Sequence, residues 1–278
     1  MGTPTHRLND GNLIPQLGLG TYLLTGQAGR DAIAQAIRLG YRLIDTAFNY
    51  ENEGVVGAAI RQAGLPREEL FVTSKLPGRH HRHDLAVKSV EESLARLGLD
   101  YLDLHLIHWP NPPLGLYVEA WQALVECRER GLVRSIGVCN FLPEHLDRII
   151  AATGVAPAVN QIQRHPYLPQ DDQLAANASR GVLVEAWSPL YRGGVLADVP
   201  AVAAVAASHG KTPAQAVLRW HIQSGVVPIP KSADPRRQAE NLAVFDFELT
   251  PEDMSALGSF PDPAKTVVAE SPEVHVEL

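Results

Sequence analysis

The sequence has few cysteines and no long hydrophobic run, and each absence excludes a class of protein. Only Cys127 and Cys139 occur among the 278 residues, which excludes a disulfide framework and suits a reducing cytosol. No run approaches the ~18 apolar residues of a membrane span. The first residues, Met1 to Arg7, lack the apolar core of a signal peptide. We therefore expect a cytoplasmic protein with no membrane partner.

Positive charge is also scarce. Lys and Arg number 24 against 31 Asp and Glu, for a formal net charge of −7. Because nucleic acids and anionic membrane surfaces bind basic patches, the composition argues against both as partners, although a local basic pocket for a small anion remains open. The ordinary content of hydrophobic residues, 45%, favours a globular chain with a large core. No exposed apolar stripe suggests assembly, so we expect a monomer.

Short β-type runs alternate with amphipathic helical runs along the whole chain. Amphipathic stretches include residues 31–39, 86–97, 117–130 and 213–222, where apolar residues recur every three or four positions. Such alternation requires a parallel sheet with crossover helices. Eight units without a break in composition predict one (β/α)8 barrel domain over residues 1–278, with an open doubly wound sheet as the alternative. The predicted strand centres are Leu19, Ile44, Val72, Leu104, Ile136, Val159, Val184 and Val227.

Two segments lie outside these units. Residues 6–9 and 12–15 predict a β-hairpin whose Asp10-Gly11 suits a type I′ turn, and this hairpin would plug the N-terminal mouth of the barrel. The segment after Leu257 contains three prolines and little periodicity. We expect it to be a C-terminal loop over the opposite, active-site mouth.

Polar residues end the predicted strands, and the carboxyl ends of barrel strands meet at one rim, where active sites lie. These residues are Asp45, Lys75, His108, Asn140, Gln161, Trp187, Ser188 and Lys231. The sequence therefore predicts a single pocket assembled from positions far apart in the chain.

Four residues of this rim suggest acid catalysis. A lysine beside a tyrosine favours the phenolate, so Lys75 should lower the pKa of Tyr50. Asp45 would hold Lys75 charged, and His108 could polarise the same carbonyl oxygen that Tyr50 protonates. No metal is required, and the missing hydride has to come from a cofactor. The tract His80 to His83 lacks a carboxylate or cysteine to complete a metal site.

The predicted cofactor site lies at the last strand. Residues 230–237 place Lys231, Arg236 and Arg237 and a serine hydroxyl around a helix start, which favours a phosphate. Asn140 and Gln161 could hold a carboxamide, and Trp187 could stack on a nicotinamide ring.

At this point the sequence resembles the aldo-keto reductase superfamily over essentially its whole length. The matching motifs include Gly40-Tyr41-Arg42-Leu43-Ile44-Asp45-Thr46-Ala47, Leu106-Ile107-His108-Trp109-Pro110, Ala158-Val159-Asn160-Gln161, Trp187-Ser188-Pro189-Leu190 and Ile229-Pro230-Lys231-Ser232. Within the superfamily it is most similar to the bacterial 2,5-diketo-D-gluconate reductase group. The resemblance implies NADPH-dependent reduction of aldehydes or ketones, including 2,5-diketo-D-gluconate or related small dicarbonyls.

The resemblance also implies roles for named residues. The catalytic set would be Asp45, Tyr50, Lys75 and His108. The substrate pocket would be edged by Tyr22, Phe48, Asn49 and Trp109. The NADP(H) site would use Gly20, Thr21, Asn140, Gln161, Trp187, Ser188, Leu190, Lys231, Ser232, Arg237, Glu240 and Asn241.

Three positions depart from the family pattern. Cys139 stands where serine is usual, which removes a strong hydrogen bond to the carboxamide, and Gln163 replaces the usual Glu. Asp234 lies where an uncharged residue is common, and its carboxylate should repel a 2′-phosphate. The sequence thus favours NADPH over NADH only weakly.

Two other functions stay open at this stage. One is a nucleotide-binding regulatory barrel without significant turnover, against which the complete catalytic set argues. The other is a metal-free barrel isomerase that uses Lys75 or His108, which would leave Trp187 and the cations around Lys231 without a role.

Overall fold

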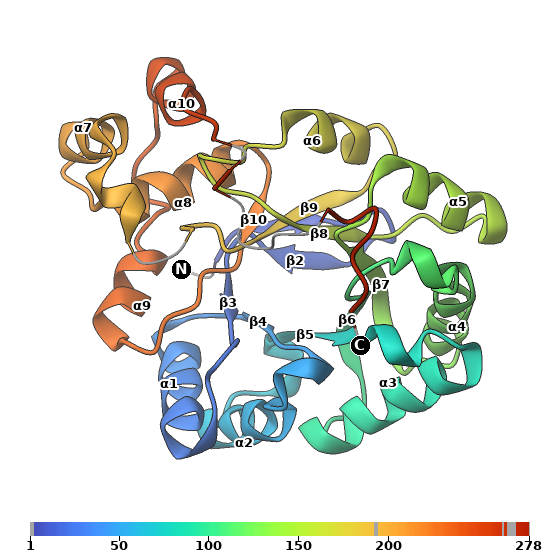
Figure 1. The fold of residues 1–278 in the computed structure, drawn as a ribbon. Helices are drawn as coiled ribbons and strands as arrows, with labels where there is room; N and C mark the ends of the chain where they lie inside the picture. The colour runs from blue at the N-terminus through green and yellow to red at the C-terminus, as the bar shows by residue number, and fades with distance from the viewer. Residues whose placement is uncertain (1–2, 192–193, 263, 266–270, 278) are drawn as a thin grey trace.

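Eight parallel strands form a nearly closed barrel in the computed structural model, which describes residues 3–191, 194–262, 264–265 and 271–277 (Figure 1). Neighbours pair in chain order, and the seam is bridged where Gly20 N–H donates to Pro230 O at 3.1 Å. The (β/α)8 prediction is confirmed, each predicted strand centre lies in a strand, and the open sheet is excluded. The strands are β3 (Gly18–Gly20), β4 (Leu43–Asp45), β5 (Phe71–Leu76), β6 (Leu102–Ile107), β7 (Val133–Cys139), β8 (Val159–Gln163), β9 (Leu183–Trp187) and β10 (Val227–Pro228).

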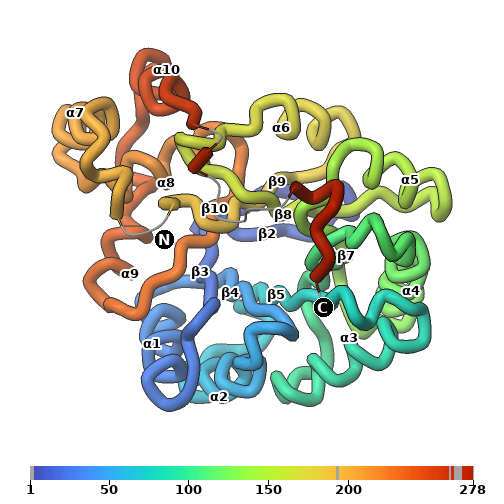
Figure 2. Tube along the Cα trace, in the orientation of Figure 1, coloured from blue at the N-terminus to red at the C-terminus, as the bar shows by residue number. Residues whose placement is uncertain are grey.

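Helices surround the barrel (Figure 2). Their apolar side chains are buried in a common core with those of the strands. Local chemistry sets their ends: α8 begins where the Thr212 hydroxyl accepts from Gln215 N–H and Pro213 takes the first helical position. No helix among the described residues is long and apolar enough to span a bilayer. The helices are α1 (Gly26–Leu39), α2 (Glu53–Ala63), α3 (His83–Leu97), α4 (Tyr117–Glu129), α5 (Pro143–Thr153), α6 (Asp171–Ala178), α7 (Pro200–Ser208), α8 (Pro213–Gln223), α9 (Pro235–Leu242) and α10 (Pro251–Gly258).

The N-terminal hairpin closes the lower mouth of the barrel as predicted. Strands β1 (Thr5–Arg7) and β2 (Leu13–Pro15) are antiparallel, and Ile14 packs with Leu43, Leu104 and Val159 in the barrel interior. The type I′ turn is wrong, because such a turn needs two residues at positive φ. The loop of residues 8–12 needs only one, Gly11 at 92°, whose N–H donates to Leu8 O at 3.0 Å.

The upper half of the barrel interior is polar. Because side chains alternate along a strand, the residues two positions after Leu43, Val159 and Leu183 also point inward. They are Asp45, Gln161 and Glu185, and all three are buried. The apolar lower layer therefore supports a charged layer directly beneath the upper rim.

Protonation of buried His105, on β6, is expected to make stability depend on pH. Desolvation lowers its pKa to about 3, and neither ring nitrogen has a hydrogen-bond partner among the described residues. Because the unfolded chain then binds the proton more readily, the free energy of unfolding should fall by about 2 kcal/mol between about pH 7 and about pH 5. Urea unfolding of wild type and His105→Leu at both pH values checks this. The difference in the free energy of unfolding between the two pH values should be about 2 kcal/mol smaller in the variant. An equal difference in the two proteins would contradict the assignment to His105.

Candidate active site

A buried ion pair lies at the upper end of strands β4 and β5. Lys75 Nζ lies 2.6 and 2.7 Å from the two carboxylate oxygens of Asp45 and donates to Thr46 O at 2.9 Å. Both side chains are almost fully removed from water. Desolvation alone would lower the pKa of Lys75, but the Asp45 carboxylate outweighs it and raises that pKa above its usual range. The lysine is therefore held as a cation in a low-dielectric layer.

Tyr50 lies above this cation, at the end of a short 3-10 helix over Phe48–Tyr50. The Lys75 ammonium lies 5.1 Å from the centre of its ring. The ring of His108 is 5.9 Å away and that of Tyr22 is 5.1 Å away, both edge to face. Closure of the barrel thus brings together Asp45, Tyr50, Lys75 and His108, as the sequence predicted.

Lys75 acts on the pKa of Tyr50 in the predicted direction, but the net shift of that pKa is upward. Desolvation of the phenol raises its pKa to about 12, although the charge and the hydrogen bond of Lys75 both act to lower it. The sequence revealed the cation but not the depth at which the fold places the phenol. Tyr50 therefore carries its proton at neutral pH, which is the form a general acid requires.

A second carboxyl group, that of Glu185, lies in the same buried layer as Asp45 and was not predicted. Gln161 uses its amide nitrogen to donate to Asp45 Oδ2 at 2.9 Å and to Glu185 Oε2 at 3.0 Å. Desolvation, together with the nearby Asp45 charge, raises the pKa of Glu185 to about 8. The signal in the sequence was a single glutamate inside the apolar run of β9, which is unusual for a buried strand.

Residues 271–277 lie across the rim next to β6 and β7, where Figure 1 shows the dark red segment. Glu277 Oε1 lies 2.6 Å from His108 Nδ1 and accepts a hydrogen bond from Asn49 Nδ2 at 2.8 Å. The ring of His275 lies 4.1 Å from that of Trp109. Residues 271–277 of the predicted loop therefore lie over the mouth and contact three predicted site residues, while residues 263, 266–270 and 278 of that loop lie outside the described residues.

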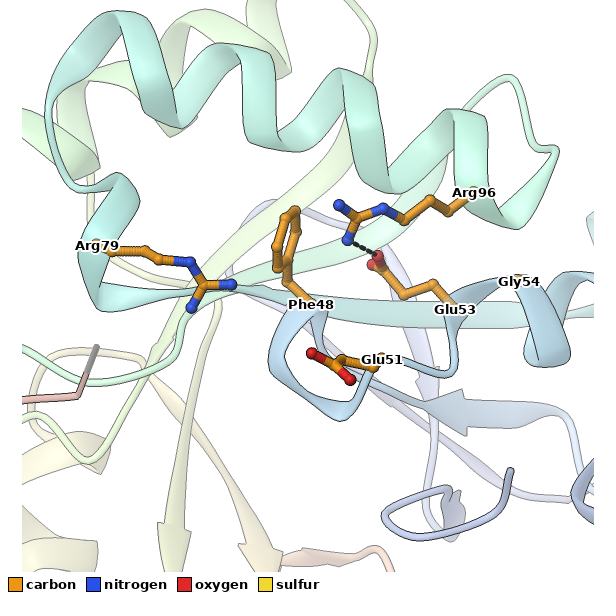
Figure 3. A pocket seen from close by; sticks show the side chains of 6 residues that line it. All are labelled: Phe48, Glu51, Glu53, Gly54, Arg79 and Arg96. Carbon is orange, nitrogen blue, oxygen red and sulfur yellow. Dashed lines mark hydrogen bonds and ion pairs between the residues drawn. The ribbon is translucent and has the colours of Figure 1, made fainter. Parts of the chain in front are cut away.

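The predicted substrate residues divide into two groups. Tyr22 contacts the Tyr50 ring, whereas Asn49 and Trp109 contact Glu277 and His275 of the segment beside His108. The Phe48 ring instead contacts the guanidinium groups of Arg96 and Arg79, at 3.8 and 5.2 Å from its centre. Figure 3 shows it between these arginines in a separate pocket of about 420 Å³, on the side of α3. There Arg96 also pairs with Glu53 at 3.4 Å.

The predicted nicotinamide residues are held by one another. Trp187 Nε1 donates to Asn140 Oδ1 at 2.9 Å, and Asn140 Nδ2 donates to the His108 carbonyl at 3.1 Å. Trp187 is partly buried and lines a cavity of about 100 Å³ together with Trp109 and Pro272. Cys139 is buried directly before Asn140, and desolvation raises the pKa of its thiol. An aromatic face and two primary amides therefore lie beside the catalytic set.

The predicted phosphate site lies at the start of α9. Lys231 and Arg237 are exposed there. The helix N–H groups are already taken, because the Asp234 carboxylate accepts from Arg236 N–H at 2.8 Å and from Arg237 N–H at 3.3 Å. Any phosphate at this end has to rely on side chains, and it has to lie near a carboxylate.

The remaining predicted cofactor residues follow the same rim. Thr21 is buried and its hydroxyl donates to Asp45 O at 2.9 Å. Ser232 Oγ accepts from Asp234 N–H at 3.1 Å. The others on the cofactor side are Gly20 at the barrel seam, partly buried Ser188, Leu190 and Glu240, and buried Asn241.

Comparisons with known proteins agree with this geometry. A model of the Aldo/keto reductase family matches residues 16–261. The chain is 51% identical to the 2,5-diketo-D-gluconic acid reductase B of Corynebacterium sp. (strain SHS752001), over 91% of this chain and 92% of that protein. It is 46% identical to the methylglyoxal reductase DkgA of Escherichia coli (strain K12), over 92% and 94% of the two chains.

Solved structures share the fold at similar identity. The apoform of Gox0644 superposes with a TM-score of 0.93 at 40% identity, over 98% of each chain. The Bombyx mori aldo-keto reductase in complex with NADP gives a TM-score of 0.88 at 39% identity, over 94% of each chain. The chain therefore belongs to the aldo/keto reductase family.

Proposed function

We propose that the protein reduces aldehydes and ketones to alcohols with NADPH, and that Tyr50 is the general acid. The observation that carries this proposal is the convergence of Asp45, Tyr50, Lys75 and His108, from four segments of the chain, at the carboxyl ends of the barrel strands. The protonated phenol, the buried cation and the imidazole suit a carbonyl oxygen that gains negative charge.

The residues present fit a reduced nicotinamide dinucleotide. The partly buried face of Trp187 and the amides of Asn140 and Gln161 suit the nicotinamide end, while the exposed cations Lys231 and Arg237 suit the phosphates. When bound, the cofactor supplies a hydride. Because both N–H groups of Gln161 already face Asp45 and Glu185, its oxygen is the atom left to accept from a carboxamide.

The protein's own residues supply the proton. Tyr50 keeps its proton in the resting site because desolvation raises its pKa to about 12. As the carbonyl becomes an alkoxide, a stronger base than a phenolate, the Tyr50 proton moves onto that oxygen. Lys75, fixed by Asp45, stabilises the phenolate that remains, and His108 orients the oxygen.

Small dicarbonyl compounds are the proposed substrates, as the names of the relatives suggest for diketogluconate and methylglyoxal. A panel of such carbonyls assayed with NADPH and NADH, reported as kcat/KM, tests this directly. Turnover of no carbonyl with either cofactor would refute the proposed function. A monomer in the cytoplasm stays a prediction from composition.

Cofactor preference should depend on Lys231 and Arg237. We expect Lys231→Ala and Arg237→Ala to raise the KM for NADPH by about 10-fold or more and the KM for NADH much less, because one lost charge-assisted hydrogen bond costs about 1.5–3 kcal/mol. Steady-state kinetics with both cofactors measures this, with Arg148→Ala, an exposed arginine of α5 on the opposite side of the barrel (Figure 1), as the control. Equal weakening of the two cofactors would remove the assignment of a 2′-phosphate to these cations.

A further inference from the structure

The side chain of Glu277 enters the site in which the proposed function needs a carbonyl. Its carboxylate lies 2.6 Å from His108 Nδ1, accepts from Asn49 Nδ2 at 2.8 Å and accepts from Gly78 N–H at 3.2 Å. Its ion pair with His108, when the imidazole is protonated, helps to hold the pKa of this largely buried carboxyl below its usual value, against desolvation, which acts to raise it. The Glu277 carboxylate thus contacts His108, the residue that would orient the substrate carbonyl.

The backbone of Glu277 is held by a dedicated contact. Asn111 Nδ2 donates to Glu277 O at 2.7 Å, and Glu277 N–H donates to Asn111 Oδ1 at 3.0 Å. One amide side chain therefore satisfies both backbone groups of one residue, as a neighbouring strand would. Asn111 is itself fully buried, at a φ of 45°, so the clamp is a fixed part of the site.

Gly78 makes room for this clamp. A Cβ atom at Gly78 would lie 2.0 Å from Asn111 Nδ2 and 2.1 Å from Glu277 O. The φ of Gly78 is outside the left-handed range, so the backbone itself would accept alanine. A glycine is therefore needed at this position so that Asn111 and Glu277 can pack against it, and not because the loop requires a backbone conformation that only glycine adopts.

We propose that Glu277 is a tethered competitor of the carbonyl substrate, so that residues 271–277 must leave the rim before a carbonyl reaches His108 and Tyr50. This inference rests on the proposed function, because it assumes that His108 binds the carbonyl. The seated segment contacts His108, Asn49 and Trp109 together, which are three of the side chains that the proposed function assigns to the carbonyl substrate, and on this proposal the segment and the substrate compete for them. Glu277 thereby sets the apparent affinity for substrate without touching the reacting atoms.

The proposal predicts a change in KM and not in kcat. We call the state in which residues 271–277 have left the rim the open state. If about 10% of the wild-type protein is in this state, the apparent affinity of the protein for substrate is reduced about tenfold. Glu277→Ala should then lower KM by about that factor. At saturating substrate the segment is displaced in both proteins, so kcat should match wild type. Glu273→Ala is the matched control, because Glu273 is an exposed carboxylate in the same segment.

Gly78→Ala should displace residues 271–277 by a steric clash, and this variant still carries the Glu277 carboxylate. We expect it to lower KM by a similar factor, and the double variant to show no further decrease, because both changes remove one seat. A fall in kcat with unchanged KM in Glu277→Ala would overturn the proposal, because Glu277 would then be positioning His108. Additive effects of the two changes would also overturn it.

Acetate binding separates failure of this inference from failure of the proposed function. With NADP⁺ bound, acetate should bind Glu277→Ala about tenfold more tightly than wild type, because Gly78 N–H and His108 Nδ1 then lose the carboxylate that contacts them. Tryptophan fluorescence follows the titration, since Trp109 lies against His275. Equal acetate affinity in the two proteins would overturn the inference even if carbonyl reduction proceeds, and a difference would support it even if no carbonyl is reduced.

Discussion

Tyr50→Phe is expected to lower kcat by about 10²- to 10⁴-fold, the usual contribution of a general acid. Phenylalanine keeps the ring contacts with Tyr22 and His108 but has no proton to give to the developing alkoxide. Affinity for NADPH should stay near that of wild type, because the cofactor contacts we propose do not include the Tyr50 hydroxyl. Cofactor titration and steady-state reduction of methylglyoxal measure the two quantities separately.

Tyr101→Phe is the matched control for this experiment. Tyr101 stacks on Arg67 and Arg134, away from the rim, so the same loss of a hydroxyl should leave kcat unchanged. Near-normal turnover in Tyr50→Phe would exclude the phenol as the proton donor. An equal loss in both variants would show that a general effect on the fold is responsible.

Lys75→Met is expected to destabilise the protein by about 3–5 kcal/mol and to abolish turnover. Removing the cation leaves the buried Asp45 carboxylate without its partner, and an uncompensated buried charge is costly. Adding Asp45→Asn should recover most of the stability, because the remaining amide is neutral, but it cannot recover turnover. Urea unfolding and carbonyl reduction, measured on both variants, distinguish the structural cost from the chemical one.

The exposed pair of Arg180 and Asp147 provides the comparison. Its atoms lie 2.7 Å apart, as close as those of the buried pair, yet the Asp147 side chain is 62% exposed. Arg180→Met should therefore cost only up to about 1 kcal/mol. A similar cost for Arg180→Met and Lys75→Met would mean that burial does not govern the energy of the Asp45–Lys75 pair.

Much of the site follows from the sequence because it depends on strand ends. Asp45 ends β4, Lys75 is the last residue but one of β5 and His108 follows β6, and closure of a parallel barrel places all such residues on one rim. That inference needs only the order of strands and helices, which the hydrophobic pattern reveals. The position of Tyr50 above Lys75 follows from the short helix after β4.

Features that depend on depth or on long-range packing could not be predicted. The Tyr50 pKa depends on how far the phenol is removed from water, which no spacing reveals. Phe48 was expected at the substrate pocket, but its ring faces Arg79 of the 3-10 helix Gly78–His80 and Arg96 of α3. The contact between Glu277 and His108 joins two residues far apart in the chain, and Glu277 lies in a segment without the strand or helix periodicity from which its position could be predicted.

The most direct test of the account is to follow the hydrogen itself. Wild-type protein is mixed with methylglyoxal and NADPH in which both hydrogens at C4 of the nicotinamide are deuterium, and the alcohol is analysed by mass spectrometry after many turnovers. We expect one deuterium on the former carbonyl carbon with wild type, and only a trace of labelled product with Tyr50→Phe under the same conditions. Unlabelled alcohol from wild type, or equal labelled product from the two proteins, would contradict hydride transfer completed by the Tyr50 proton.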